Sequence, residues 1–564
     1  MGVTKVLAES QTPVSTERIF NVIGKGDVEQ IRDRDRRQFK FSPYEPTGLY
    51  ASPNEKITIQ VEGTQNIQAY IGTFSYDAGW WNDSYSQNPV VKSFTLKPGE
   101  NTIENTNGGM IYFYNSQQGG TVKAEIKTGG TPIPFFELGK HTKQDLVNML
   151  DMYPNAHAVE LKGERSLITA SPERVKKYLL GSNTDPEELL KKIDEAVRIQ
   201  DRLAGLSEEQ ADKHYISFAE DNHSLDYYMY ATNYSTAYVG DAIQHVLNVK
   251  EFTENGWGPW HEMGHQRQQL PWKWDGLGEV TNNIYSMFSQ RAWGNPSNLE
   301  NDGRYESAFT YLNKPQSEKD YNKIDDVFIK LVMFWQLDLA FGEDFYPKLH
   351  QLYRAMPNEE LPKTDDEQIQ GFIYNTSKVA QKNLLPFFDK WGLKASSETR
   401  QKIEALNLQT VTAPIWEGTD SKPVQLNTLP KQNMKVIASS EELGVEPATN
   451  AIDGNPYTRW HSKWSEPNKY PSNLTIDLGE TRTITQLSYL PRQDESPNGR
   501  ILSYNIYTST DGVNYQKVTS GTWENSKKQQ FATFNPVTAK YVKLEVVNGV
   551  NGYASAGEID ILGY

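Results

Sequence analysis

The segment Trp257–Ser286, WGPWHEMGHQRQQLPWKWDGLGEVTNNIYS, decides the fold of the central part of the chain. If it is helical, His261 and His265 lie one turn apart on the same face, where both imidazoles can bind a single zinc ion. Glu262 follows the first of these histidines, so its carboxylate can reach a water molecule on the metal and act as a general base. The sequence contains nine histidines, and this is the only pair at positions i and i+4.

A catalytic zinc site keeps one position open and needs a third protein ligand. Glu279 is the candidate, because it lies in a second segment with helical apolar spacing, GEVTNNIYSMFSQ. Asn283 follows one turn later on the same face, where its side-chain oxygen can accept the free ring N–H of a ligating histidine. Pro271, Gly276 and Gly278 supply the turn between the two predicted helices.

The stretch GWGPWHEMGH, followed by GEVTNNIYS, resembles the signature of the enhancin-like, mucin-degrading zinc metallopeptidases, a branch of the gluzincins. The resemblance extends towards the N-terminus through PTGLYASPNEKITIQVEG and TPIPFFELGKHT. It implies His261, His265 and Glu279 as zinc ligands and Glu262 as the base. An HExxH motif also arises by chance, so the downstream glutamate is what makes the pattern specific.

The composition limits the classes of partner that the protein is expected to bind and the compartment in which it is expected to act. The net charge is −15 and no run rich in lysine and arginine occurs, so we expect neither nucleic acid nor anionic membranes as partners. The chain has no cysteine, so any metal must be held by histidines and carboxylates. No apolar stretch is long enough to be a transmembrane segment, and MGVTKVLAES lacks the apolar part of a signal peptide. Because the expected substrate is extracellular, we expect a secreted or cell-surface protein whose signal peptide is absent from this sequence.

The first part of the chain is expected to be a helical lead-in over residues 1–40 and a β-sandwich over 41–130. The sandwich is indicated by short alternating runs such as KITIQVEG, IQAYIGTF and GMIYFYN, separated by turn residues. Trp80 and Trp81 are expected to pack in a core or between domains, with a ligand platform as the alternative.

Residues 131–410 are predicted to form the catalytic domain, an α/β part followed by a helical lobe. In SNTDPEELLKKIDEAVRIQDRLAG, Asp185 is a candidate helix N-cap, with Pro186 at the first helical position. His223 and His245 are expected to be structural. A peptidase site also needs a donor that stabilises the tetrahedral oxyanion. The sequence offers three candidates without deciding among them: Tyr285, Arg304 and His350.

A Pro- and Thr-containing linker is predicted over 411–431, before an all-β module over 432–564. Pieces such as NAIDGNPYTRWHS and AGEIDILGY resemble a discoidin-like (coagulation factor 5/8 type C) module, a β-sandwich jelly roll that often binds galactose-type sugars. The resemblance implies sugar contacts at His461, Arg492 and Asn498, with Trp464 and Tyr553 as stacking rings. A module that only packs on the peptidase, or binds lipid or protein, remains the alternative.

The same resemblance implies a structural calcium site, because Asp453, Thr458 and Glu558 match positions near a calcium ion in that family. Calcium prefers oxygen ligands, several of them backbone carbonyls, so side chains identify such a site only weakly.

The sequence thus predicts a multidomain α+β protein: an N-terminal β-sandwich, a gluzincin-type α/β and helical catalytic domain, and a C-terminal β-sandwich jelly roll. The expected function is a secreted zinc endopeptidase that cleaves mucin-type O-glycoproteins on the N-terminal side of a glycosylated Ser or Thr. The expected sugars are of galactose or N-acetylgalactosamine type. A zinc peptidase acting on bare peptides, or a non-catalytic glycan-binding adhesin, are the alternatives.

Tryptophans flank the predicted metal helix at positions 257, 260 and 272, and some of them are expected to be core residues. A ring that faces the cleft would stack on a sugar beside the scissile bond. On this view Trp257 contacts the glycan, and Asn282 or Arg304 binds its hydroxyl and N-acetyl groups.

Overall fold

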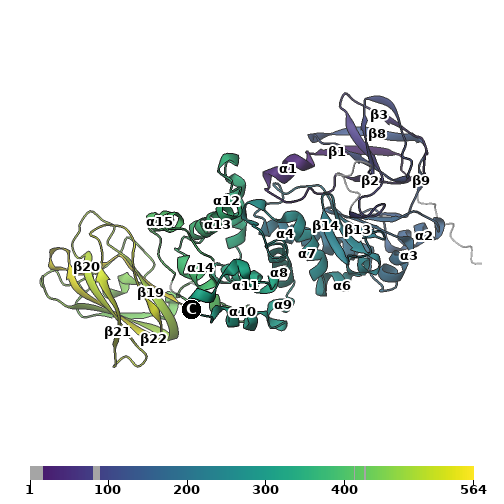
Figure 1. Ribbon diagram of the computed structural model, residues 1–564. Coiled ribbons are helices and arrows are strands. Elements are labelled where there is room, and N and C mark those ends of the chain that lie inside the picture. Colours follow the sequence, from purple (N-terminus) through teal and green to yellow (C-terminus); the bar gives the residue numbers. More distant parts are fainter. Residues whose placement is uncertain (1–16, 81–88, 412, 425–426, 564) are drawn as a thin grey trace, which may run out of the picture. The chain divides into compact units, whose positions relative to one another are not determined.

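The computed structural model describes residues 17–80, 89–411, 413–424 and 427–563, and Trp81 therefore lies outside the described residues (Figure 1). The chain divides into two compact units. One comprises Met1–Asp302 with Tyr346–Gln368, and the other comprises Gly303–Phe345 with Ile369–Tyr564. The first unit combines sheets with helices, and the second combines helices with a C-terminal sheet domain, so the predicted multidomain α+β class is confirmed.

The N-terminal β-sandwich consists of two antiparallel sheets that share one core. The four-stranded sheet has the order β1–β8–β3–β6, formed by Ile19–Lys25, Gln118–Thr128, Ile57–Val61 and Gly99–Ile103. The five-stranded sheet has the order β5–β4–β7–β2–β9, formed by Lys92–Leu96, Ile67–Ile71, Gly109–Tyr114, Glu45–Ala51 and Thr131–Pro132. Every second residue of β3 and β4 is buried, as the alternating sequence predicts.

The prediction of a helical lead-in is wrong for Ile19–Lys25. This segment is strand β1, which pairs with β8 and places Val22 in the sandwich core. The mixed-charge helix is confined to α1, Val28–Arg34, whose N-terminus is capped by Asp27. Because β8 is distant in sequence, no local pattern reveals this pairing.

A mixed six-stranded sheet follows the sandwich. Its order is β10–β11–β12–β13–β15–β14, formed by Phe135–Glu137, Val159–Lys162, Ser166–Ala170, Ile216–Asp221, Ser235–Val239 and Met229–Thr232. Strands β12, β13 and β15 are parallel, and β14 closes one edge antiparallel to β15. Helix α2, Lys143–Met152, packs beside β10, and helix α4, Pro186–Leu203, packs on β11 and β12. Asp185 caps α4 and Pro186 begins it, as predicted.

Helices α7 (Trp257–Arg267) and α8 (Asn282–Ala292) pack against each other, and α7 also packs against the edge strand β14. Trp260 and Met263 of α7 belong to the same core as the six-stranded sheet. This packing leaves the opposite face of α7 for the two histidines of the motif.

The second unit contains a group of helices and the C-terminal module. The helices are α10 (Arg304–Leu312), α11 (Val327–Phe341), α14 (Leu385–Trp391) and α15 (Ser397–Ala405), whereas α12 (Phe345–Ala355) and α13 (Asp365–Ala380) are divided between the units. Among the helices of the described ranges, none combines the length and apolar content that a membrane crossing requires.

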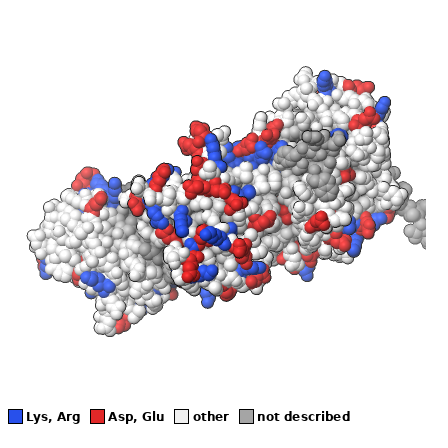
Figure 2. Space-filling model, viewed as in Figure 1, with Lys and Arg blue, Asp and Glu red and all other residues white. Residues whose placement is uncertain are grey.

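The C-terminal module is built on a seven-stranded sheet. Its order is β16–β24–β19–β22–β20–β21, with β17 paired to β19, formed by Asn427–Thr428, Glu558–Gly563, Ser472–Leu490, Gln530–Gly549, Ile501–Ser509, Gln516–Thr522 and Lys435–Ala438. Strands β18 (Trp460–His461) and β23 (Ser555–Ala556) form a separate two-stranded antiparallel sheet. Figure 2 shows this module as mostly uncharged on the visible face, while acidic and basic side chains alternate over the helices.

Candidate functional site

Helix α7 presents both motif histidines next to α8 because a glycine allows the two helices to approach closely. A Cβ atom on Gly264 would lie 2.4 Å from the backbone oxygen of Asn282, so no larger residue fits at this crossing. The turn between the helices brings Glu279, which precedes α8, over the same face of α7. Gly264 thus permits the close approach of α7 and α8 that brings Glu279 next to the two histidines.

Three candidate ligand atoms converge at this crossing. Oε2 of Glu279 lies 2.9 Å from Nε2 of His261 and 3.2 Å from Nε2 of His265, and the candidate ligand atoms of the three residues all lie within 4.8 Å of one another. With zinc–ligand bonds of about 2.0–2.2 Å, the ligand atoms of a tetrahedral zinc are separated by roughly 3.4 Å. The donor set and its spacing therefore fit zinc. In the described part of the chain, no other group of three such side chains meets these distances.

Side chains behind the histidines orient their rings. Nδ1–H of His261 donates to Oδ1 of Asn283 over 2.7 Å, and Nδ1–H of His265 donates to Oε1 of Gln268 over 2.8 Å. With the proton on Nδ1, each Nε2 keeps its lone pair for a metal. Asn283 thus lies where the sequence predicted it.

Gln268 was missed by the sequence-based prediction. Its side-chain amide donates to Thr281 Oγ1 over 2.7 Å and to the Gly278 carbonyl over 3.0 Å. Gln268 therefore links the ring of one candidate ligand, His265, to the turn that carries another candidate ligand, Glu279. The available signal was its position one turn after His265, at the C-terminal cap of α7.

Glu262 has the environment of a proton acceptor at neutral pH. The residue is 5% exposed, and its Oε2 has no hydrogen-bond partner among the described residues. Burial raises the pKa of Glu262 to about 7. By contrast, the neighbouring imidazoles of His261 and His265 hold the pKa of Glu279 well below its usual value. Glu262 thus suits proton transfer, whereas Glu279 favours the ionised form that a metal ligand needs.

The residues predicted to contact a substrate glycan differ in how far they are exposed to solvent. Trp257 is half-buried at the start of α7. Trp260 and Trp272 are buried core residues. Asn282 is 0% exposed, and its amide nitrogen lies 3.3 Å from Nε2 of His265, so the prediction that it binds a sugar is wrong. It is buried because it is the first residue of α8, at the point of closest approach to α7.

Two of the three oxyanion candidates are excluded by burial. Tyr285 and His350 lie in the interior and bond to each other over 2.6 Å, so neither can reach a bound peptide. Burial also lowers the pKa of His350 to about 3. Arg304 belongs to the second unit, where it donates to Asp326 over 2.9 Å, and its role stays a prediction.

The histidines expected to be structural have protein partners. Nε2 of His223 lies 3.2 Å from the Tyr76 carbonyl, and Nε2 of His245 lies 2.8 Å from the Tyr228 hydroxyl.

The C-terminal module holds a second candidate site, a pocket of about 250 Å³. All five residues predicted to bind sugar line this pocket: His461, Trp464, Arg492, Asn498 and Tyr553. Three further lining residues were missed by the sequence analysis: Glu446, Arg459 and Ser496. Trp464 is 50% exposed and its Nε1–H donates to Glu446 over 3.1 Å. Asp494 holds the guanidinium of Arg492 through two bonds of 2.6 and 2.7 Å. A fixed guanidinium beside an exposed indole ring can bind a polar ligand that also has an apolar face.

Asp453 and Thr458 lie in one loop and Glu558 begins β24 next to it, but all three are bonded within the protein. Thr458 donates its hydroxyl proton to Asp453 over 2.6 Å, and the Gly454 amide donates to Glu558 over 3.1 Å. The ammonium group of Lys431 contacts Glu558 directly. A cation would have to share this carboxylate with Lys431, and the calcium site stays a prediction.

Comparison with known proteins places three segments in described families. Residues 129–392 match the family of Peptidase M60, enhancin and enhancin-like. Residues 28–128 match the N-terminal domain of M60-like peptidases, and residues 435–559 match the F5/8 type C domain.

Solved structures with the same fold include a functionally unknown conserved protein from Bacillus anthracis. It is 45% identical with a TM-score of 0.68, over 82% of this chain and 96% of that chain. The ZmpB metallopeptidase from Clostridium perfringens is 18% identical with a TM-score of 0.62, over 92% of this chain and 100% of that chain. Among curated proteins, a sialidase from Micromonospora viridifaciens is 36% identical over 148 residues. That match covers 25% of this chain and 23% of the sialidase. The chain thus spans less than a quarter of the sialidase's length.

Proposed function

Since the chain belongs to the M60 peptidases, the enhancin and enhancin-like family, and is a metallopeptidase, we propose that it is a zinc endopeptidase that cleaves mucin-type O-glycoproteins. The observation that carries the proposal is the convergence of His261, His265 and Glu279 beside the buried Glu262. The proposed cleavage position is the N-terminal side of a Ser or Thr that carries a short O-glycan. Such a substrate lies outside the cell, which supports a secreted or cell-surface protein.

In the proposed mechanism, His261, His265 and Glu279 would hold a zinc ion. Bound zinc supplies Lewis-acid polarisation of the scissile carbonyl and of the attacking water. Glu262 takes the proton from that water and later delivers it to the leaving amine, a task that suits its pKa of about 7. Asn283 and Gln268 keep both imidazole rings in the orientation that presents Nε2.

A glycoprotein substrate is supported by the pocket of the C-terminal module. The exposed ring of Trp464 offers a face for the C–H groups of a sugar, and Arg492 offers forked donors for its hydroxyl oxygens. Near the metal, Trp257 is the remaining aromatic candidate, because Trp260 and Trp272 are buried. We propose that the module binds galactose or N-acetylgalactosamine units, and that Trp257 contacts the glycan at the cleaved bond.

The test is to incubate the protein with an O-glycoprotein before and after enzymatic removal of its O-glycans, and to sequence the new termini. The expected result is cleavage of the glycosylated form only, with each new terminus at a glycosylated Ser or Thr. Equal cleavage of both forms would favour a peptidase for bare peptides. No cleavage by the zinc-loaded protein would favour a glycan-binding adhesin.

A further inference from the structure

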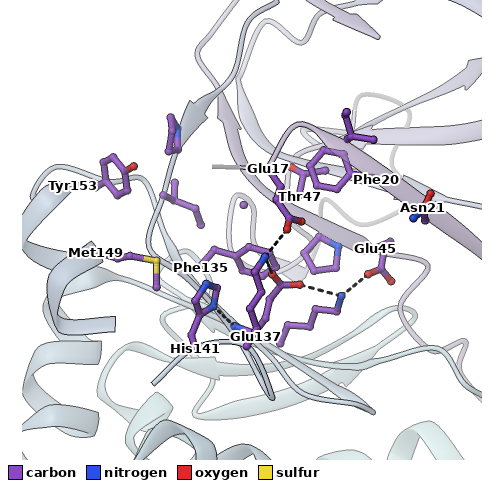
Figure 3. A pocket seen from close by; sticks show the side chains of 17 residues that line it. Glu17, Phe20, Asn21, Glu45, Thr47, Phe135, Glu137, His141, Met149 and Tyr153 are labelled. Atoms are coloured by element: carbon purple, nitrogen blue, oxygen red, sulfur yellow. Dashed lines mark hydrogen bonds and ion pairs between the residues drawn. The ribbon is translucent and has the colours of Figure 1, made fainter. Parts of the chain in front are cut away.

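A pocket of about 210 Å³ lies between the N-terminal sandwich and the first strands of the six-stranded sheet, within the first unit (Figure 3). We call it the β10 pocket, and the residues used below are Phe20, Phe135, Glu137, His141, Tyr153 and Lys162. They come from β1, β10, the turn before α2, the end of α2 and β11. None of them belongs to the candidate metal site or to the pocket of the C-terminal module.

One wall of the β10 pocket is a row of alternating charges, drawn with dashed lines in Figure 3. Lys162 lies 2.8 Å from Glu45 and 3.5 Å from Glu137. Lys140 continues the row, 3.0 Å from Glu137 and 2.7 Å from Glu17. Each ammonium group thus lies between two carboxylates. A charged ligand would have to displace one of these partners, so the wall favours a neutral ligand that exchanges hydrogen bonds with it.

His141 supplies a hydrogen-bond donor of defined position. The backbone N–H of Glu137 donates to Nδ1 of His141 over 3.0 Å, so Nδ1 carries no proton and the neutral ring carries its proton on Nε2. Burial lowers the pKa of His141, which keeps the ring neutral. In the described ranges, neither Nε2–H of His141 nor the hydroxyl of Tyr153 has a hydrogen-bond partner. Both groups line the β10 pocket, where they are available to a ligand.

Three aromatic rings contribute to the rest of the lining. Phe135 lies near His141, with Tyr153 and Phe20 on either side of the pocket in Figure 3. A pyranose ring matches this combination, because its C–H groups pack on aromatic faces while its hydroxyl groups exchange hydrogen bonds with carboxylates, ammonium groups and an imidazole N–H. The volume is below the roughly 300–1,000 Å³ of drug-sized sites, so the ligand is a single ring.

We propose that the β10 pocket binds one neutral saccharide unit, a hexose or N-acetylhexosamine, as a second carbohydrate site of this protein. This goes beyond the proposed peptidase function, because binding there needs neither the metal nor cleavage. The sugar can come from a free glycoside or from the end of a glycoprotein glycan.

The test measures binding by the full-length protein carrying Arg492→Ala, which removes the forked donors of the C-terminal pocket. The probes are methyl galactoside, methyl N-acetylgalactosaminide, methyl sialoside as the charged control, and an O-glycopeptide. Saturation-transfer NMR detects contact, and a titration gives the affinity. Neutral glycosides are expected to bind, and His141→Ala and Tyr153→Phe are each expected to weaken binding roughly tenfold by removing one hydrogen bond. Tyr457→Phe, at an exposed ring outside the pocket, is the matched control and should change nothing.

Three outcomes would overturn the proposal: binding of neither the neutral glycosides nor the O-glycopeptide in the Arg492→Ala background, binding that His141→Ala and Tyr153→Phe both leave unchanged, or tighter binding of the sialoside than of the neutral probes. Circular dichroism shows whether each variant is folded. Since no readout involves cleavage, a failure of the proposed peptidase function would leave these results interpretable. Binding of the O-glycopeptide but not of free glycosides would assign the ligand to glycoprotein ends.

Discussion

At the scale of single residues, Glu262 and Gln268 serve different purposes around the same candidate metal position. Among the described residues, Oε2 of Glu262 has no hydrogen-bond partner and is available to a water molecule, whereas Gln268 accepts a hydrogen bond from the His265 ring.

Glu262→Gln should keep the metal content near that of the unchanged protein and lower turnover of an O-glycopeptide by roughly 10²–10⁴-fold, because the base is removed and the ligands are not. Elemental analysis and a cleavage assay measure the two quantities. Glu254→Gln, at an exposed glutamate on α6 (Val249–Glu254), is the matched control and should leave both unchanged. Near-normal turnover of a metal-loaded Glu262→Gln protein would disprove the assignment of the base.

Gln268→Leu should weaken zinc affinity by about 10–100-fold, because His265 loses the acceptor that orients its ring. A competition titration with a chelator measures this affinity. Gln30→Leu, at an exposed glutamine on α1, should leave it unchanged. If both variants bind zinc equally well, Gln268 has only a structural role.

At the scale of elements, the site depends on how closely α7 and α8 approach. Gly264→Ala should destabilise the first unit by about 1–3 kcal/mol and weaken zinc binding, because its Cβ atom would meet the Asn282 carbonyl at 2.4 Å. Gly278→Ala is the matched control, since a Cβ atom there has no neighbour within 4 Å. Thermal unfolding and zinc titration of the two variants should separate them. Equal stability would mean that the helix crossing tolerates the extra methyl group.

A buried carboxyl group links the sandwich to the six-stranded sheet. Tyr112 of β7 donates to Glu160 of β11 over 2.9 Å, and Thr169 of β12 donates to the same oxygen over 2.7 Å. Burial raises the pKa of Glu160 to about 7, above the value near 4.5 expected in the unfolded chain. Between these two values the folded state binds more protons than the unfolded state. Stability from this group is therefore complete below pH 4.5 and is lost as the pH rises to about 7.

Glu160→Gln removes this titration and keeps an acceptor for both hydroxyl groups. Its free energy of unfolding, relative to that of the unchanged protein, should rise by roughly 2–3 kcal/mol between pH 4.5 and pH 8. Urea unfolding at both pH values measures the difference. A difference that does not depend on pH would show that Glu160 is ionised in the folded protein.

At the scale of the whole molecule, the metal site and the pocket of the C-terminal module lie in different units. Trp464→Ala should therefore raise the KM for a mucin-like glycoprotein with many glycans about tenfold or more, and leave cleavage of a short O-glycopeptide unchanged, because only the larger substrate can engage both sites. Tyr457→Ala, at an exposed ring outside the pocket, is the control. An equal effect on both substrates would contradict this division of roles.

The sequence by itself determined the parts that depend on local spacing. The helical period brings His261 and His265 to one face, and it places Asn283 one turn after Glu279. Alternation predicts β3 and β4, and capping residues predict the start of α4. The family resemblance, which is confirmed, rests on the same short stretches.

Only the tertiary structure decided which polar and aromatic side chains are buried. Asn282 lies two residues after Val280 in the predicted helical segment, and the packing of α8 against α7 buries it. Strand β1 exists because β8 pairs with it, and Lys431 lies against Glu558, far along the chain. The β10 pocket likewise joins Phe20, Phe135 and Lys162 from different elements. Hydrogen-bonded turns repeat every few residues and so leave a pattern in the sequence, whereas contacts between distant segments depend on the packing of the whole core and leave none.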